Sequence, residues 1–213
     1  PLLTREQEVE ISKRIEDAEL EVKRILYRLG FTAKEHIALA EKLTADPPKE
    51  RFDRVTLDKV IETREKHLNT LQRLIEKVRE EDGEVDKKYL VWRKASKSRA
   101  EKAFGDFNKL NGKLQKNFSK FLFKQKVIEE MALVADNIHD KMQQNLRSIE
   151  KLREAPKSSQ VDMMLQAEEG KLTALEAFVR KPAEDYLNTY EELQHFARKA
   201  HQAKTEMIEA NLR

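Results

Sequence analysis

Apolar side chains recur every three or four residues through most of this chain, as they do in amphipathic α-helices. The first such stripe runs from Ile11 to Leu29. Thr4 and Gln7 precede it at the spacing of a capping box, in which two side chains satisfy the free backbone N–H groups of a helix start. The pattern therefore predicts a helix that begins at Arg5 and ends at Gly30 in the left-handed conformation.

Two further helices are expected in the first half of the chain. Thr32 and Glu35 again have capping-box spacing and predict a shorter helix, which Asp46-Pro47-Pro48 ends. A third stripe extends over residues 57–78, and Gly83 is expected to end this helix in a turn. A helix antiparallel to it should follow.

The returning helix has apolar residues on one face over residues 85–114. Asn111-Gly112 is a turn signal, so the chain either turns there or stays helical to about Phe121. We expect a break somewhere between Phe121 and Lys126.

The remaining stripes predict helices to the end of the chain. One covers residues 128–149 and ends before Pro156. Ser159 and Asp162 are expected to cap the next helix, which Pro182 either kinks or replaces with a new helix. Because short connections force long amphipathic helices to lie antiparallel, the sequence predicts an all-α fold, a bundle of long antiparallel amphipathic helices.

Composition agrees with this class and excludes several functions. Charged residues make up 38% and hydrophobic residues 39% of the 213 residues, with 5 Gly, 5 Pro and no Cys. The lack of cysteine excludes disulfides and thiolate metal sites and fits a cytoplasmic protein. No apolar run approaches the ~20 residues that span a bilayer, so no membrane partner is expected. Because the chain has neither a glycine-rich phosphate loop nor a nucleophile motif, we expect no enzyme, no cofactor and no small-molecule substrate.

Positive charge is concentrated in one segment, although the net charge is only +3. Residues 87–127 contain thirteen Lys and Arg against two acidic residues, a net charge of +11, which leaves −8 for the rest. Five lysines of this segment follow helical spacing and would line one candidate electrostatic face: Lys109, Lys113, Lys116, Lys120 and Lys124. Such a face either runs along phosphates or is a solvated surface beside an aromatic core.

Two pairs of residues have the spacing of ligands in ferritin-like di-metal bundles, namely Glu192 with His195 and Asp136 with His139. His195 falls on the polar side of its helix, whereas the ligands of such bundles project inward. We therefore expect no metal site. The other histidines have no spacing that indicates catalysis: His36, His67 and His201.

The two ends of the chain carry the most specific signal. Leu2–Glu16 (LLTREQEVEISKRIE) resembles the conserved helix that precedes the non-conserved insertion of primary sigma factors of bacterial RNA polymerase. Ala203–Arg213 (AKTEMIEANLR) resembles the start of the promoter-reading region that follows this insertion. The long middle is similar to the insertion in size and helix content alone.

This resemblance implies three segments: the conserved helix (1–30), the helical insertion (31–202) and the start of the promoter-reading, core-binding region (203–213). It implies an initiation factor that brings RNA polymerase core to promoter DNA and helps to hold the melted non-template strand. Asn211 and Arg213 match family residues that contribute to a pocket for a flipped base. The helix is then expected to continue beyond Arg213, and the fragment itself to be mainly a scaffold.

Two other classes remain as alternatives. A helical adaptor or coiled-coil protein-interaction module would use its apolar stripes to bind partner helices, and it is favoured if the two end helices do not pack together. A di-metal oxidoreductase would need the ligand pairs named above to face each other. In the sigma family, by contrast, the two helices that border the insertion pack side by side.

Overall fold

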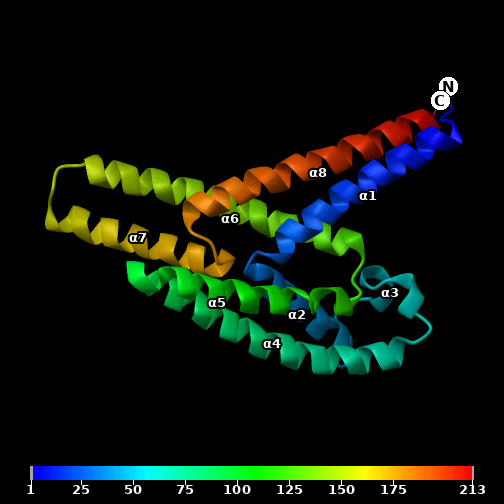
Figure 1. Ribbon diagram of the computed structural model, residues 1–213, viewed down its shortest axis with the longest axis horizontal. Coiled ribbons are helices and arrows are strands. Elements are labelled where there is room, and N and C mark those ends of the chain that lie inside the picture. Colours follow the sequence, from blue (N-terminus) through cyan, green and yellow to red (C-terminus); the bar gives the residue numbers. More distant parts are fainter. Residues whose placement is uncertain (1, 213) are drawn as a thin grey trace.

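The computed structural model describes residues 2–212, which form helices joined by short connections (Figure 1). The α-helices are α1 (Arg5–Tyr27), α2 (Phe31–Thr44), α3 (Phe52–Val55), α4 (Arg64–Lys94), α5 (Lys97–Gln115), α6 (Gln125–Glu154), α7 (Ser159–Val179) and α8 (Ala183–Asn211). Two short 3₁₀-helices are η1 (Asp58–Val60) and η2 (Phe118–Phe121). The described residues contain no strand, so the expected all-α fold class is confirmed.

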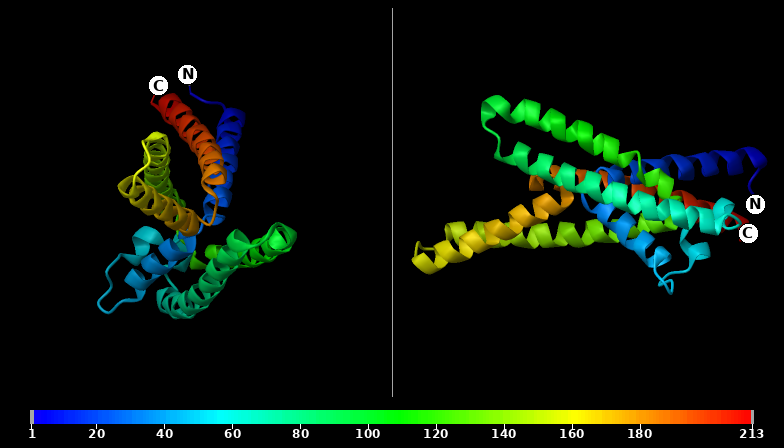
Figure 2. Two further views of the ribbon diagram at one scale, coloured as in Figure 1. Left: turned by 90° about the vertical axis from the view of Figure 1, so that its left-hand side faces the viewer. Right: turned by 90° about the horizontal axis from the view of Figure 1, so that it is seen from below.

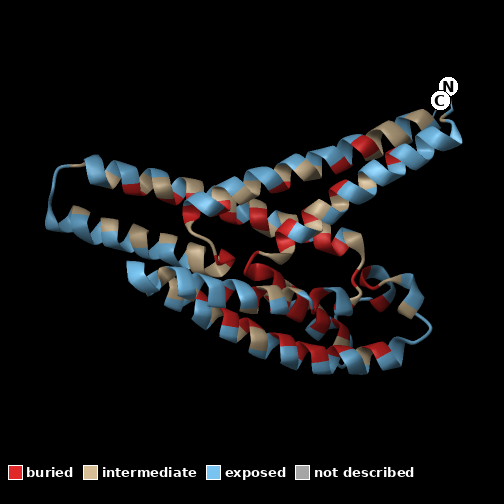
Figure 3. Ribbon diagram, in the orientation of Figure 1, coloured by how far each residue is buried: buried red, intermediate tan, exposed pale blue. Residues whose placement is uncertain are grey.

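The long helices form three antiparallel pairs that meet near the middle of the molecule (Figures 1 and 2). The pairs are α1 with α8, α4 with α5, and α6 with α7, while α2 packs on α4 at their junction. Buried residues gather where the pairs meet, and the outer ends of the α4–α5 and α6–α7 pairs are largely exposed (Figure 3). None of the helices within residues 2–212 has both the length and the apolar character needed to cross a membrane.

The start of α1 is as predicted, but its end is not. Thr4 Oγ1 accepts a hydrogen bond from the Gln7 N–H at 3.2 Å, and Gln7 Oε1 accepts one from the Thr4 N–H at 2.9 Å. Gly30 does not adopt the expected left-handed conformation, since its φ is −60°. Its N–H instead donates to the Val179 carbonyl at 3.0 Å. Gly30 is therefore a point of close approach between the start of α2 and the end of α7.

The capping box predicted at Thr32 and Glu35 is absent. Helix α2 begins at Phe31, so Thr32 already lies inside the first turn. The Thr32 side chain is fully buried and its hydroxyl donates to the Leu26 carbonyl near the end of α1. The threonine satisfies a carbonyl of the preceding helix rather than an N–H of its own.

Gly83 does not end a helix, and the predicted turn was wrong by twelve residues. Helix α4 continues through Gly83 to Lys94, and the chain reverses at Ala95 and Ser96. Val85 and Tyr89 extend the buried stripe of α4 beyond the glycine. A glycine inside a helix costs about 1 kcal/mol, whereas burying one large apolar side chain contributes roughly 1.5–3 kcal/mol. Packing therefore outweighs the local turn signal.

The start of this helix was also placed too early. The chain from Phe52 to Val60 forms the short α3 and η1 instead of a continuous helix, and α4 begins at Arg64. The single isolated β-bridge found in the described residues joins Thr56 to Phe123. This bridge draws the chain before α4 toward the chain before α6.

The later connections agree more closely with the sequence. Helix α5 passes through Gly112 but ends at Gln115, six residues before the predicted range of 121–126. The 3₁₀-helix η2 follows, and the left-handed Leu122 before α6 lies within that range. The cap of α7 is Ser158, whose Oγ accepts from the Val161 N–H, and not Ser159. Pro182 precedes a new helix, α8, and does not kink α7.

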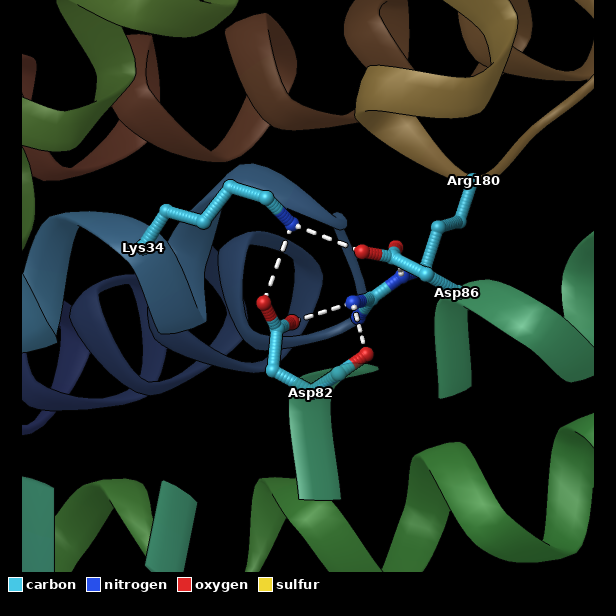
Figure 4. A network of polar contacts seen from close by, with 4 residues as sticks. All are labelled: Lys34, Asp82, Asp86 and Arg180. Atoms are coloured by element: carbon cyan, nitrogen blue, oxygen red, sulfur yellow. Dashed lines mark hydrogen bonds and ion pairs between the residues drawn. The ribbon is translucent and has the colours of Figure 1, made fainter. Parts of the chain in front are cut away.

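An ion network, buried at Arg180 and Asp82 but partly exposed at Lys34 and Asp86, fixes the turn between α7 and α8 against α4 and α2 (Figure 4). Arg180 has a φ of 55°, and its side chain is 1% exposed. Its Nε donates to Asp86 Oδ1 at 2.8 Å, and its Nη2 donates to the Asp82 carboxylate and to the Asp82 carbonyl. Lys34 of α2 donates to both aspartates, at 3.0 and 3.3 Å. Three elements, namely α2, α4 and the turn between α7 and α8, are thereby held together at one point.

One hydrophobic core runs through the junction. Its buried residues come from all eight α-helices of the described residues and from η2. The predicted segment border at residues 202 and 203 falls inside α8, and the border at residue 30 falls in the short connection between α1 and α2. The division into three segments stays a prediction.

We expect Gly30→Ala to destabilise the fold. A Cβ at position 30 would lie 2.5 Å from the backbone oxygen of Phe178, so α2 and α7 would have to move apart. The expected loss is about 1–3 kcal/mol in the free energy of unfolding, measured by urea denaturation. Gly83→Ala is the matched control, because a Cβ there meets nothing within 4 Å and should stabilise α4 by up to about 1 kcal/mol. Equal stability of the two variants would contradict this account of the junction.

Candidate functional site

The two end helices lie side by side along much of their length. Helix α1 contributes Ile11, Ala18 and Val22 to the buried face, and α8 contributes Ala200 and Ala203. Small alanine side chains allow the two helix axes to approach closely. The start of α1 and the end of α8 are therefore neighbours, as Figures 1 and 2 show.

Charged side chains fix the register of this pair. Arg14 of α1 binds the Glu206 carboxylate of α8 with both terminal nitrogens, at 2.8 and 3.2 Å. This hydrogen bonding lowers the pKa of Glu206 below its ordinary value. Lys204 pairs with Glu19 of α1 at 2.6 Å and with Glu129 of α6 at 3.2 Å. Because these groups are partly exposed, they specify the alignment of the helices more than they add stability.

One of the two residues that the resemblance assigns to a flipped-base pocket lies at the far end of this pair. Asn211 is the last residue of α8 and is exposed. Arg213 lies outside the described residues. The role of both residues stays a prediction.

The five-lysine face predicted from helical spacing is divided among three elements. Lys109 and Lys113 are exposed on α5, and Lys116 follows at its C-terminal cap. Lys120 lies in η2, and Lys124 precedes α6. The chain leaves the helical path because three nearby phenylalanines are buried in the core: Phe118, Phe121 and Phe123.

Lys124 binds residues of the segment that precedes α4. Its Nζ donates to the Asp53 carbonyl at 2.7 Å and pairs with Asp58 at 3.4 Å. Lys120 donates to the Asn117 side chain at 3.1 Å. These two lysines are thus engaged by neighbouring side chains and backbone, and they do not extend the face of α5.

A basic surface nevertheless lies along one side of α5, with the exposed Asp106 between its lysines. Lys102, Lys109, Lys113 and Lys116 are separated by seven, four and three residues, so they share one helix face. All four are exposed, and none forms an ion pair with the rest of residues 2–212. We call these four lysines the α5 lysine face. Unneutralised charge of this kind attracts polyanions.

Two of the residues considered as metal ligands, Asp136 and His139, instead contact side chains of α8. Asp136 accepts hydrogen bonds from the Tyr190 hydroxyl at 2.7 Å and from Gln194 at 3.0 Å. The His139 ring stacks on Tyr190 at a centroid distance of 4.0 Å, and His195 is exposed. No cluster of three or more His, Asp or Glu able to hold a metal occurs between residues 2 and 212.

Two histidines are buried, which the sequence did not indicate. His67 bonds through Nε2 to the Phe121 carbonyl at 3.1 Å. His36 is fully buried, and its Nδ1–H donates to the Thr32 carbonyl at 2.8 Å. Aromatic rings surround the His36 imidazole: Tyr27, Phe118, Phe121 and Phe123. Burial lowers the pKa of His36 to about 4.

No protein-family model matches this chain.

His36 should make the fold sensitive to acid. Its folded pKa of about 4 lies below the ordinary value of 6.5, so the unfolded chain binds the proton more readily. The stabilisation by neutral His36 is complete above about pH 6.5 and is lost as the pH falls toward 4, by about 3 kcal/mol. In His36→Phe this part of the pH dependence should disappear. Urea denaturation at pH 7 and pH 4 measures the difference, and the exposed His201→Gln is the control.

The α5 lysine face should bind duplex DNA in a salt-dependent way. Changing Lys102, Lys109, Lys113 and Lys116 together to Glu should weaken binding by about tenfold or more at low salt, and less at high salt. Fluorescence anisotropy over a salt series measures the effect. The control changes four exposed lysines elsewhere to Glu, for the same change in net charge: Lys66, Lys141, Lys151 and Lys157. If both variants bind equally, the α5 lysine face is a solubilising surface.

Proposed function

We propose that this chain is part of a primary sigma factor of bacterial RNA polymerase. In this proposal α1 is the conserved helix before the insertion, and the end of α8 opens the promoter-reading region. The complete protein would bring RNA polymerase core to promoter DNA in the cytoplasm. Its action is binding and strand capture, and the proposal involves no catalysis, cofactor or small-molecule substrate.

The observation that carries the proposal is the pairing of α1 with α8. Leu2–Glu16 and Ala203–Arg213, which resemble the two borders of the sigma insertion, lie almost two hundred residues apart in sequence. The structure brings Arg14 from the first segment onto Glu206 from the second. A helical adaptor gives no reason for these two segments to meet, so the pairing favours the sigma factor over that alternative.

The geometry also supports a scaffold role for the middle of the chain. Helix α6 packs against both α1 and α8, and Lys204 links all three helices. The Arg180 network holds the beginning of α8 against α4. The middle segment therefore contacts α8 both at its beginning and along its length, and Asn211 is the last residue of this helix.

Promoter opening by the complete gene product, mixed with RNA polymerase core, tests the proposal. Core with this protein should initiate at a promoter, and core alone should not. Arg14→Glu places two carboxylates together and should reduce open-complex formation several-fold, because α1 and α8 separate locally. Adding Glu206→Arg to the same molecule should restore it. Abortive transcript yield and thymine reactivity in the melted region are the measurements.

Arg24→Glu is the control for this experiment, because its partner Glu21 lies on the same helix. It should leave promoter opening unchanged. Failure of the wild-type protein to direct initiation would overturn the sigma assignment. Failure of the charge exchange to restore opening would instead show that the contact between α1 and α8 does not matter for it.

A further inference from the structure

The outer end of the α4–α5 hairpin exposes aliphatic side chains for a definite reason. Tyr89 and Trp92 occupy the face of α4 that meets α5. The Trp92 ring stacks on Phe107 at 5.7 Å and lies 4.7 Å from Phe104, between ring centroids. This aromatic cluster packs the end of α4 against α5. The two residues between Tyr89 and Trp92 in the chain must then point elsewhere.

Those two residues, Leu90 and Val91, are 43% and 58% exposed. They line a groove of about 590 Å³ at the hairpin end, together with Lys94, Ala95, Ser96, Arg99 and Ala103. We call it the tip groove. Its floor is aliphatic, and its polar rim carries two cations. Large apolar side chains gathered at one exposed place commonly mark a binding surface.

The cations of the tip groove are not neutralised by the fold. Neither Lys94 nor Arg99 forms an ion pair within residues 2–212, whereas the neighbouring Lys87 and Arg93 pair with Glu84 and Glu176. Further lysines at this end, Lys97 and Lys102, are exposed and also lack an ion pair with the described residues. The groove therefore combines an apolar floor with an unbalanced positive charge.

We propose that the tip groove binds an acidic amphipathic segment of a partner protein. In such a segment, aliphatic side chains cover Leu90 and Val91 while carboxylates contact Lys94 and Arg99. Duplex DNA offers phosphates but no aliphatic group to cover the floor. A membrane surface requires a broad apolar face rather than a groove between two helix ends. This inference goes beyond the proposed function and does not depend on it.

The test uses the whole 213-residue chain and a synthetic helical peptide of about 16 residues, with leucine on one face and glutamate on the other. Binding is followed by anisotropy of the labelled peptide and by backbone amide shifts. The amides of residues 90–103 should shift. Arg99→Glu should weaken binding about tenfold at low salt, and Val91→Ser should weaken it several-fold.

Two control variants have matched chemistry outside the groove. Lys151→Glu makes the same charge change at an exposed position of α6, and Leu133→Ser removes an aliphatic side chain that is 67% exposed on the same helix. Both should bind the peptide as the unmodified chain does. Because Val91 and Arg99 are exposed, the test variants should keep the thermal stability of the unmodified chain, which circular dichroism checks.

Three results would overturn the proposal. The first is the absence of saturable peptide binding, or shifts that lie outside the groove. The second is that duplex DNA shifts the same amides, and that Arg99→Glu weakens this DNA binding while Val91→Ser does not. This result would assign the tip groove to nucleic acid. The third is tighter binding to vesicles with phosphatidylserine than to the peptide, which would assign it to a lipid surface.

Discussion

Arg180 holds the turn between α7 and α8 against α4, and the meeting of the three helix pairs depends on this contact. A buried guanidinium costs several kcal/mol unless its donors are satisfied, and here Asp82 and Asp86 satisfy it. The left-handed backbone of Arg180 aims its side chain at α4, and the lack of a side chain at Gly30 leaves room beside it. Removing Asp82 would leave the buried Arg180 with Asp86 as its only carboxylate partner among the described residues, so the stability of this turn depends on the whole network.

Much of the fold could be predicted from the sequence because most stripes are long. The helices that carry Ile11, Ile138 and Leu193 were found from their periodicity alone, and the Thr4 capping box is confirmed. The errors lie where a local signal competes with packing. Gly83 suggested a turn, but the buried stripe continues on both sides of it, so the helix continues. Local sequence signals do not show that Val85 and Tyr89 pack against other helices.

The candidate sites followed the same division. The end segments could be singled out because the order of their residues resembles the two borders of the sigma insertion. Their contact through Arg14 could be expected only from this resemblance. The tip groove could not be predicted, since a turn placed at Gly83 separates Leu90 from Arg99 in space. His36 was equally hidden, because its environment is built by phenylalanines more than eighty residues away in sequence.

The outer end of the α4–α5 hairpin extends beyond the point at which Arg180 holds α4. The second helix, α5, packs mainly on α4, and its outer half is exposed (Figure 3). Adding or removing whole helical turns beside Ala95 and Ser96 would change the reach of the hairpin without moving α1 or α8. The length of the α4–α5 hairpin can thus change in evolution while α1 and α8 stay in place. The distance at which the hairpin end meets a partner can then change without any change in the rest of the fold.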